Sequence, residues 1–267
     1  MIWSSVTFLA LMAIAFVVRG NTYELSIVSA VLGVSLTGVY SVIRSFDRIT
    51  WWSVVKAGTI YRRSPVRVSM AYLVCIRVED EYLLVRGNRI RTQFQPVGGV
   101  FKTDLTASDL YARFRAEPDN RFKPDLESQG DLRLRLPGGS LQKFLRWFRR
   151  GSEREILPTR EFYEELVVPG VIDSTIFGHF DCRRMGIKSF PLRFDKQAGC
   201  QQLILVEIWS LRPNGEQTTE LQRLKRAKPR VKNVYFASRD EMISGGRKGV
   251  TKAHFDISPT CSWLVGV

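Results

Sequence analysis

The sequence predicts an N-terminal two-helix transmembrane hairpin followed by a cytoplasmic α+β domain with a mixed sheet between helices. Residues 2–18 and 25–43 are uncharged and strongly apolar, and a short polar break separates them. Since about twenty apolar residues span a bilayer, both segments qualify as spans. From residue 66 onward, strand-like segments flank a short helix-like segment rich in carboxylates, which is typical of an α+β domain.

The flanking charges predict the orientation of the hairpin. A cleaved signal peptide is the alternative for residues 2–18, but this segment lacks a basic start and a second apolar segment follows almost at once. Basic residues are far more frequent after the second segment than in the connecting loop; they are Arg44, Arg48, Lys56, Arg62, Arg63 and Arg67. The positive-inside rule therefore places the N-terminus and the C-terminal domain in the cytoplasm.

Small residues recur every four positions in the second span, at Ser29, Gly33, Thr37 and Ser41. Such a stripe lets helices approach closely and can drive association in lipid. Two interpretations remain open: several hairpins assemble through this face, or the face packs against the first span of the same hairpin.

The chain therefore divides into three segments: a hairpin over 1–49, a juxtamembrane linker over 50–65, and a domain over 66–267.

The net charge of +14 indicates anionic partners or an anionic membrane surface. Four scattered cysteines and two histidines argue against zinc and against a disulfide framework.

Within the domain, alternating and periodic segments predict strands and helices. Residues 103–150 are predicted to be a long insertion in this domain, with its own helices and one strand. The predicted strands are Met70–Arg77, Glu81–Arg86, Arg89–Val97, Leu132–Leu136, Val171–Phe180 and Gln201–Leu211. The predicted helices of the insertion are Asp104–Phe114 and Leu141–Phe148, and Val234–Phe236 and His254–Ile257 are expected to be short elements that close the domain.

The candidate metal site lies in Arg160–Leu166. In a helix, Glu161, Glu164 and Glu165 project from one face, while Phe162 and Leu166 pack against a core. Thr159 is the expected N-cap. Clustered carboxylates suit Mg²⁺, which prefers oxygen ligands and bridges to phosphates. The alternative is a solvated acidic helix without a ligand.

Arg89, Arg91 and Phe94 are candidate ligand-binding residues, since arginines bind phosphates and an aromatic ring stacks on a base. Surface arginines beside a core aromatic residue are the alternative. The basic run within Glu220–Lys232 allows the same two interpretations, a phosphate-binding face or a solvated one.

The Arg-Glu-x-x-Glu-Glu pattern at Arg160–Glu165 resembles the second half of the Nudix box, and Pro96-Val97-Gly98-Gly99 resembles the turn that precedes it. Two departures stand out. A long segment separates the two parts, and a second turn, Pro137-Gly138-Gly139, lies closer to the helix. The upstream glutamate of the box falls at Ser152, with Glu153 and Glu155 nearby.

The whole chain resembles the two-transmembrane effectors with a SMODS-associated Nudix domain that belong to bacterial CBASS anti-phage systems. The local marks are Leu145–Phe148 and Arg160–Leu166. The resemblance implies a multi-pass protein of the inner membrane. The resemblance further implies that the Nudix-like domain binds a cyclic di- or trinucleotide made by a cognate CD-NTase, with Gly98 and Gly99 among the candidate ligand-binding residues. It also implies that the helices form a homo-oligomer that disrupts the membrane.

Two other functions stay open at this point. A membrane-anchored Nudix hydrolase would use Glu161, Glu164 and Glu165 as catalytic and Mg²⁺-binding residues on a nucleoside diphosphate-linked substrate. A membrane-tethered nucleic-acid binder is favoured by net charge alone.

Overall fold

The computed structural model describes residues 48–87, 92–119, 129–227, 233–246 and 256–266. The chain divides into two compact units, Met1–Trp51 and Trp52–Val267. The predicted spans, 2–18 and 25–43, lie outside the described residues. Among the helices that are described, none is long and apolar enough to cross a membrane.

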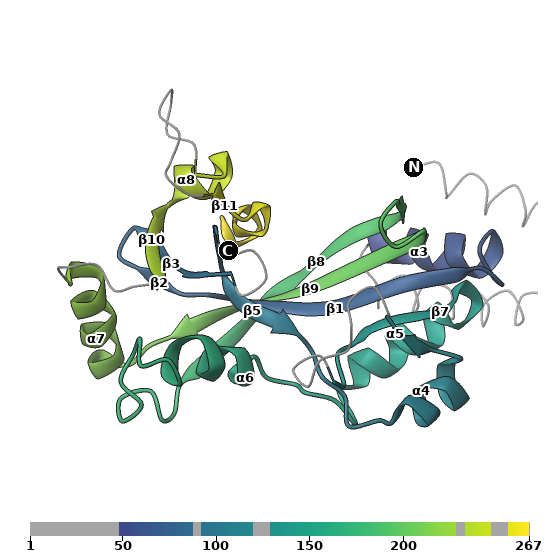
Figure 1. Ribbon diagram of the computed structural model, residues 1–267, viewed down its shortest axis with the longest axis horizontal. Coiled ribbons are helices and arrows are strands. Elements are labelled where there is room, and N and C mark those ends of the chain that lie inside the picture. The colour runs from purple at the N-terminus through teal and green to yellow at the C-terminus, as the bar shows by residue number, and fades with distance from the viewer. Residues whose placement is uncertain (1–47, 88–91, 120–128, 228–232, 247–255, 267) are drawn as a thin grey trace, which may run out of the picture. The chain divides into compact units, whose positions relative to one another are not determined.

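Two sheets form the second unit (Figure 1). Within the described residues, the larger sheet has six strands in the order β6-β7-β1-β9-β8, and β5 also pairs with β1. Its members are β1 (Pro65–Cys75), β5 (Val97–Val100), β6 (Glu117–Pro118), β7 (Arg133–Pro137), β8 (Asp181–Asp195) and β9 (Cys200–Arg212). Since β1 pairs with β9 in parallel and with β5 and β7 antiparallel, the sheet is mixed, as predicted.

The smaller sheet, in the same described part of the chain, has the order β10-β3-β4-β11, and β2 pairs with β3. Its strands are β2 (Arg77–Val78), β3 (Glu81–Arg86), β4 (Gln93–Gln95), β10 (Val234–Ser238) and β11 (Asp256–Ile257). β2 and β3 form a hairpin, so only the end of the predicted strand Met70–Arg77 pairs with the predicted strand Glu81–Arg86. β1 itself belongs to the other sheet.

One edge of β1 is shared by two strands. β7 pairs with Pro65–Ser69, and β5 pairs with Ala71–Val74. Met70 lies between the two ladders: its N–H donates to Leu132 O at 3.1 Å and its carbonyl accepts from Phe101 N at 3.0 Å. The sequence neighbours of these two residues, Val100, Lys102, Asp131 and Arg133, therefore meet at one point on the sheet.

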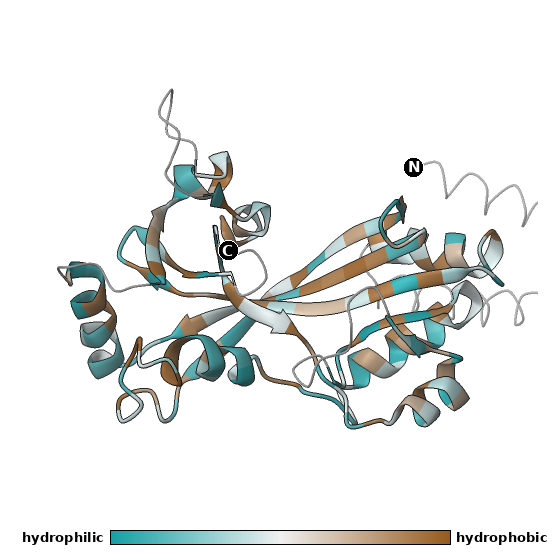
Figure 2. Ribbon diagram, in the orientation of Figure 1, coloured by the Kyte–Doolittle hydropathy of each residue, from teal (hydrophilic) through white to brown (hydrophobic). Residues whose placement is uncertain are grey.

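The helices bury their apolar sides in the second unit. They are α3 (Arg48–Thr59), α4 (Ala107–Phe114), α5 (Leu141–Arg150), α6 (Thr159–Phe162), α7 (Gly215–Arg226) and α8 (Arg239–Ser244), with short 3-10 turns η1 (Gly138–Ser140) and η3 (Pro259–Leu264) and a π-helical turn η2 (Tyr163–Val167). Figure 1 shows α4, α5 and α6 on one side of the larger sheet. Figure 2 shows apolar residues along β1 and β9, the central strands of this sheet.

The insertion extends the larger sheet. Its strand β7 pairs with β1, and Phe144, Leu145 and Phe148 of α5 are buried, as the sequence predicted. The N-terminal helix of the insertion begins later than expected, because Thr106 caps it and accepts a hydrogen bond from Asp109 N.

The prediction of a strand at Val171–Phe180 was wrong. This segment is a series of turns in which Asp173 accepts from the Thr175 N–H and hydroxyl, both at 2.7 Å. Ile172 and Phe177 of this segment are buried. An aspartate that accepts a hydrogen bond from the backbone two residues later favours a turn.

Candidate functional site

The carboxylate segment is helical but not a regular α-helix. α6 begins at Thr159, and its N-cap is Pro158 without a side-chain hydrogen bond, so the prediction of Thr159 as N-cap was wrong. The helix then widens into the π-helical turn η2. Phe162 and Leu166 are fully buried, as predicted. Single π-helical turns are frequent at functional sites.

The Pro96–Gly99 turn, although distant in sequence, packs against this helix. Gly98 N donates to Glu165 Oε2 at 3.2 Å. Gly99 leaves room for Glu161, because a Cβ at this position would lie 1.9 Å from Glu161 Oε1. The second turn, Pro137–Gly139, lies instead against the backbone of Ala57 and Tyr61. The first turn is therefore the one that belongs to the carboxylate helix.

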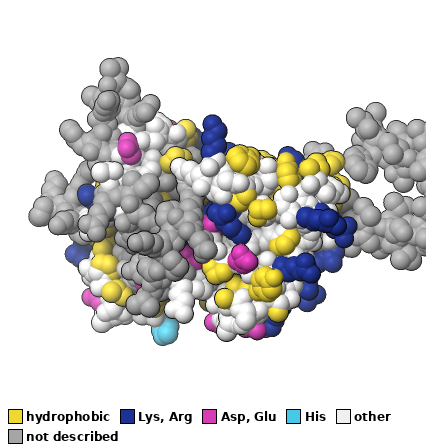
Figure 3. All heavy atoms as spheres, turned by 45° about the vertical axis from the view of Figure 1, so that its right-hand side comes forward, with side chains coloured by type: hydrophobic (Ala, Val, Ile, Leu, Met, Phe, Trp, Pro, Cys, Tyr) yellow, Lys and Arg dark blue, Asp and Glu magenta, His cyan; other side chains and the backbone are white. Residues whose placement is uncertain are grey.

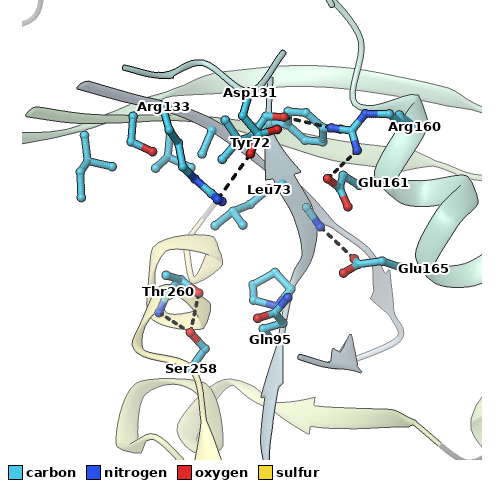
Figure 4. Close-up of a pocket in the computed structure, with 18 of the residues that line it drawn as sticks. Tyr72, Leu73, Gln95, Asp131, Arg133, Arg160, Glu161, Glu165, Ser258 and Thr260 are labelled. Carbon is cyan, nitrogen blue, oxygen red and sulfur yellow. Dashed lines mark hydrogen bonds and ion pairs between the residues drawn. The ribbon is translucent and has the colours of Figure 1, made fainter. Parts of the chain in front are cut away.

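Arg160 ties the carboxylates together (Figure 4). Its Nη1 donates to Glu161 Oε1 at 2.8 Å and to Glu164 Oε2 at 3.1 Å, and its Nη2 donates to Val100 O at 3.0 Å. Its Nε lies 3.4 Å from Glu155 Oε1. One guanidinium thus contacts three carboxylates and bonds to the backbone of β5.

Glu155 takes the place that the sequence pattern assigned to Ser152. Ser152 is exposed. Glu153 points elsewhere, to Arg113 and to the indole N–H of Trp147. Glu155 contacts Arg160 and accepts from Lys102 N at 3.2 Å. The upstream carboxylate is present, but three residues later than the Nudix spacing predicts.

Burial controls the protonation of these groups. Burial and the neighbouring Glu161 raise the pKa of Glu165 to about 8, against the hydrogen bond from Gly98 N, which lowers it. Burial also raises the pKa values of Glu161 and Glu155, and the Arg160 charge opposes this shift. Glu165 is therefore largely protonated at neutral pH.

These residues do not fit a bound Mg²⁺ in the arrangement observed. Carboxylates bind a metal ion in their deprotonated form, and burial, which raises the pKa of Glu165 to about 8 in the absence of a cation, opposes that form. Arg160 already occupies Glu161 and Glu164. Across the part of the chain that the structure describes, no three or more His, Cys, Asp or Glu side chains are grouped so that they could hold a metal ion.

A cavity of about 770 Å³ lies beside the carboxylate helix. On one face of the larger sheet it is lined by Ser69 and Ala71 of β1 and by their partners Ile204 and Val206 of β9. One wall contains Glu161, Glu164 and Glu165 and lies past β5 on the other face, because Glu161 abuts Gly99, the partner of Tyr72. The opposite wall contains Ser258, Thr260 and Trp263 and lies on the face of Ala71 and Ile204, because Trp263 packs on Phe190, the partner of Ile204. Lys102, Asp131, Arg133 and Arg160 also line it. Figure 4 shows Thr260 and Glu165 on opposite sides of Leu73.

The cavity is chemically mixed. Arg133 is 3.4 Å from Asp131, at the point where β7 gives way to β5 along β1. Tyr72 also lines the cavity, and its buried hydroxyl has no hydrogen-bond partner among the described residues. Because this hydroxyl is fully buried, a ligand in the cavity does not reach it in the observed arrangement.

The cavity includes only some of the predicted ligand-binding residues. Gly98 and Gly99 line it. Phe94 lies in the hydrophobic core instead, with its ring 5.6 Å from that of Tyr235. Arg89 and Arg91 lie outside the described residues. Sequence reasoning missed Lys102, Asp131, Arg133 and the C-terminal residues, because only the pairing of distant strands brings them to the carboxylate helix.

The mixed sheet, the Gly-Gly strand and the Arg-Glu-x-x-Glu-Glu helix packed against it define a Nudix-type domain. More narrowly, the chain matches the SMODS-associated NUDIX domain over residues 65–265 and belongs to this family. A comparison with curated proteins gives no match.

Proposed function

We propose that this chain is a membrane effector of a cyclic-oligonucleotide antiviral defence system. In this proposal its Nudix domain senses a cyclic di- or trinucleotide, the product of a cognate CD-NTase. The segments 2–18 and 25–43 then assemble in the bacterial inner membrane and disrupt it, which kills the infected cell. The observation that carries the proposal is the cavity of about 770 Å³ beside the carboxylate helix.

The size and lining of the cavity support a nucleotide ligand. Small-molecule sites typically have volumes of ~300–1,000 Å³ and a few convergent polar groups. Lys102 and Arg133 supply charged donors for phosphates, and Trp263 supplies an aromatic surface for a base. Figure 3 shows that Lys and Arg side chains are also frequent among hydrophobic ones over the right-hand half of the face turned forward. This positive charge attracts anionic ligands.

The state of the carboxylates supports sensing over hydrolysis. A hydrolase of this type needs ionised carboxylates around a metal ion. Here Arg160 pairs with Glu161 and Glu164, and burial keeps Glu165 protonated at neutral pH. The same wall can bind a ligand without hydrolysing it.

Ligand binding is coupled to assembly only if the ligand prefers the assembled state. If the segment 25–43 spans the membrane as a helix, Ser29, Gly33, Thr37 and Ser41 recur on one face, and small residues in that pattern suit close packing in lipid. We therefore expect the ligand to stabilise an oligomer of the whole chain.

The alternative is an Mg²⁺-dependent hydrolase of nucleoside diphosphate-linked substrates. One observation favours it: Glu161, Glu164 and Glu165 all line the same cavity. A ligand that displaced Arg160 from Glu161 and Glu164 would make these two carboxylates accessible to a metal ion.

One experiment separates the two functions. Cyclic di- and trinucleotides are titrated calorimetrically into the full chain in detergent with Mg²⁺ present, and the mixture is then analysed for cleavage. The proposal predicts saturable binding of a cyclic nucleotide that is recovered intact, and weaker binding by Arg133→Ala but not by Lys143→Ala, a change on an exposed lysine of α5 outside the cavity. Absence of binding, together with Mg²⁺-dependent cleavage of a linear substrate that Glu161→Gln abolishes, would instead establish the hydrolase.

A further inference from the structure

The C-terminal segment is joined to the Gly-Gly turn through β4. β11 pairs in parallel with β4, with Ile257 opposite Phe94, and Ser258 N donates to Phe94 O at 2.8 Å. From β4 the chain passes through Pro96 into the Gly98–Gly99 strand. β4 therefore adjoins both the C-terminal segment and the Gly98–Gly99 strand against which the carboxylate helix packs.

The 3-10 turn η3 has one face toward the core and another toward the cavity. A 3-10 helix has three residues per turn, so residues three apart lie on one face. Cys261 and Leu264 are almost fully buried in the core cluster. Thr260 and Trp263, also three apart, both line the cavity. The core contacts of the first pair fix the direction in which the second pair points.

The Trp263 ring packs against a residue of the larger sheet. Its ring lies 4.4 Å from the ring of Phe190 on β8, at 42°. The indole is only partly buried, so surface remains on the side of the cavity. The sheet surface on the same face is apolar, formed by Ala71, Ile204 and Val206. The hydroxyls of Ser258 and Thr260 lie 2.8 Å apart on the same segment.

The two ends of the cavity thus differ in chemistry. The end beside α6 carries the carboxyls and Arg160, whereas the end at η3 carries an indole, an apolar sheet surface and two hydroxyls. A nucleobase needs an aromatic or apolar surface for its faces and hydrogen-bonding groups for its edge. Phosphates need the cations Lys102 and Arg133, which line the cavity as well.

We propose that Trp263 is the base-stacking residue of this cavity and that Ser258 and Thr260 bind the edge of the stacked base. The inference rests on the proposed function and assigns the end of the cavity at η3 to a purine, because the larger ring system covers more of the indole. It also makes the C-terminal segment part of the binding site.

The test uses the full chain in detergent with cyclic di-AMP, cyclic di-GMP, cyclic GMP–AMP and cyclic di-UMP as probes. Trp263→Ala weakens binding of the purine-containing probe at least ~10-fold, and Trp263→Phe, which keeps an aromatic ring, weakens it less. Trp52→Ala is the matched control, since Trp52 is exposed and does not line the cavity. Circular dichroism checks that each variant is folded.

Fluorescence gives a second measurement that does not depend on Trp263→Ala being folded. Stacking on the indole quenches wild-type emission on ligand binding, and Trp263→Phe loses this quenching while it still binds. If the wild type binds a probe and both Trp263 variants bind it as tightly, or if quenching persists in Trp263→Phe, the inference is overturned and the proposed function stands. If the wild type binds none of these probes and none of the cyclic trinucleotides used to test the proposed function, that function fails and the inference fails with it.

Discussion

Two glycine pairs, Gly98–Gly99 and Gly138–Gly139, follow prolines in similar sequences but meet different neighbours. A Cβ on Gly99 would meet the end of the Glu161 side chain, whereas a Cβ on Gly138 would lie 2.4 Å from Tyr61 O and 2.5 Å from Ala57 O. The first pair makes room for a side chain of the site, and the second lets two backbone segments approach. The same residue pattern therefore serves binding in one place and packing in the other.

Gly138→Ala is expected to have the largest effect on stability. Two backbone carbonyls cannot move aside as a side chain can, so we expect a loss of ~3 kcal/mol, or roughly 10 °C in Tm. Thermal unfolding of the full chain in detergent measures it. Gly139→Ala is the control, because its nearest neighbour is the flexible Arg62 side chain at 3.2 Å. Equal Tm values for the two variants would contradict this account.

Glu165→Gln is expected to remove a pH dependence of stability. The folded-state pKa of Glu165 is about 8, above the ~4.3 of an unfolded glutamate. Between these values the folded state holds a proton that the unfolded state has lost, so the free energy of unfolding falls as pH rises.

From pH 5 to pH 7 we expect this fall to be ~2 kcal/mol larger in the wild type than in Glu165→Gln. Thermal unfolding at several pH values measures the difference. Glu117→Gln, a change at an exposed residue, should keep the wild-type slope. Parallel pH profiles for wild type and Glu165→Gln would show that Glu165 is ionised in the folded state.

Gly99→Ala is expected to cost less stability than Gly138→Ala but to affect binding. The added methyl group displaces the Glu161 side chain, which is flexible, so we expect a loss of ~1 kcal/mol. Because Glu161 lines the cavity, its displacement should weaken binding of a cyclic nucleotide about tenfold, or ~1.4 kcal/mol. Calorimetry measures this, again with Gly139→Ala as control. Unchanged affinity would remove Glu161 from the binding wall.

Mg²⁺ is expected to have the smallest effect. Since Arg160 occupies Glu161 and Glu164, millimolar Mg²⁺ should change the wild-type Tm by less than ~1 °C relative to chelator. Arg160→Gln frees both carboxylates and should make the Tm depend on Mg²⁺. A large Mg²⁺ effect on the wild type would support the hydrolase.

The sequence predicted the elements with clear periodicity. Gln201–Leu211 alternates and forms most of β9, and Phe144, Leu145 and Phe148 mark one side of α5. β8 was not predicted, since most of its side chains are exposed and no alternation marks them. The carboxylates were found because local spacing places them on one helix. The opposite wall was not found, because Trp263 reaches the site only through the pairing of β11 with β4.

The exposure of β8 has a consequence for copies of the chain held close together. In the described part of the sheet β8 is the last strand, it spans Asp181–Asp195, and it pairs only with β9. Long free edges promote aggregation unless charge, proline or bulges interrupt them. β8 has all three: Pro191, register shifts at Arg184/Gly186 and Phe190/Arg193, and the cations Arg183, Arg184, Lys188 and Arg193. Like charges therefore repel between neighbouring copies along this edge. We expect that crowding alone does not lead to pairing of β8 strands and aggregation.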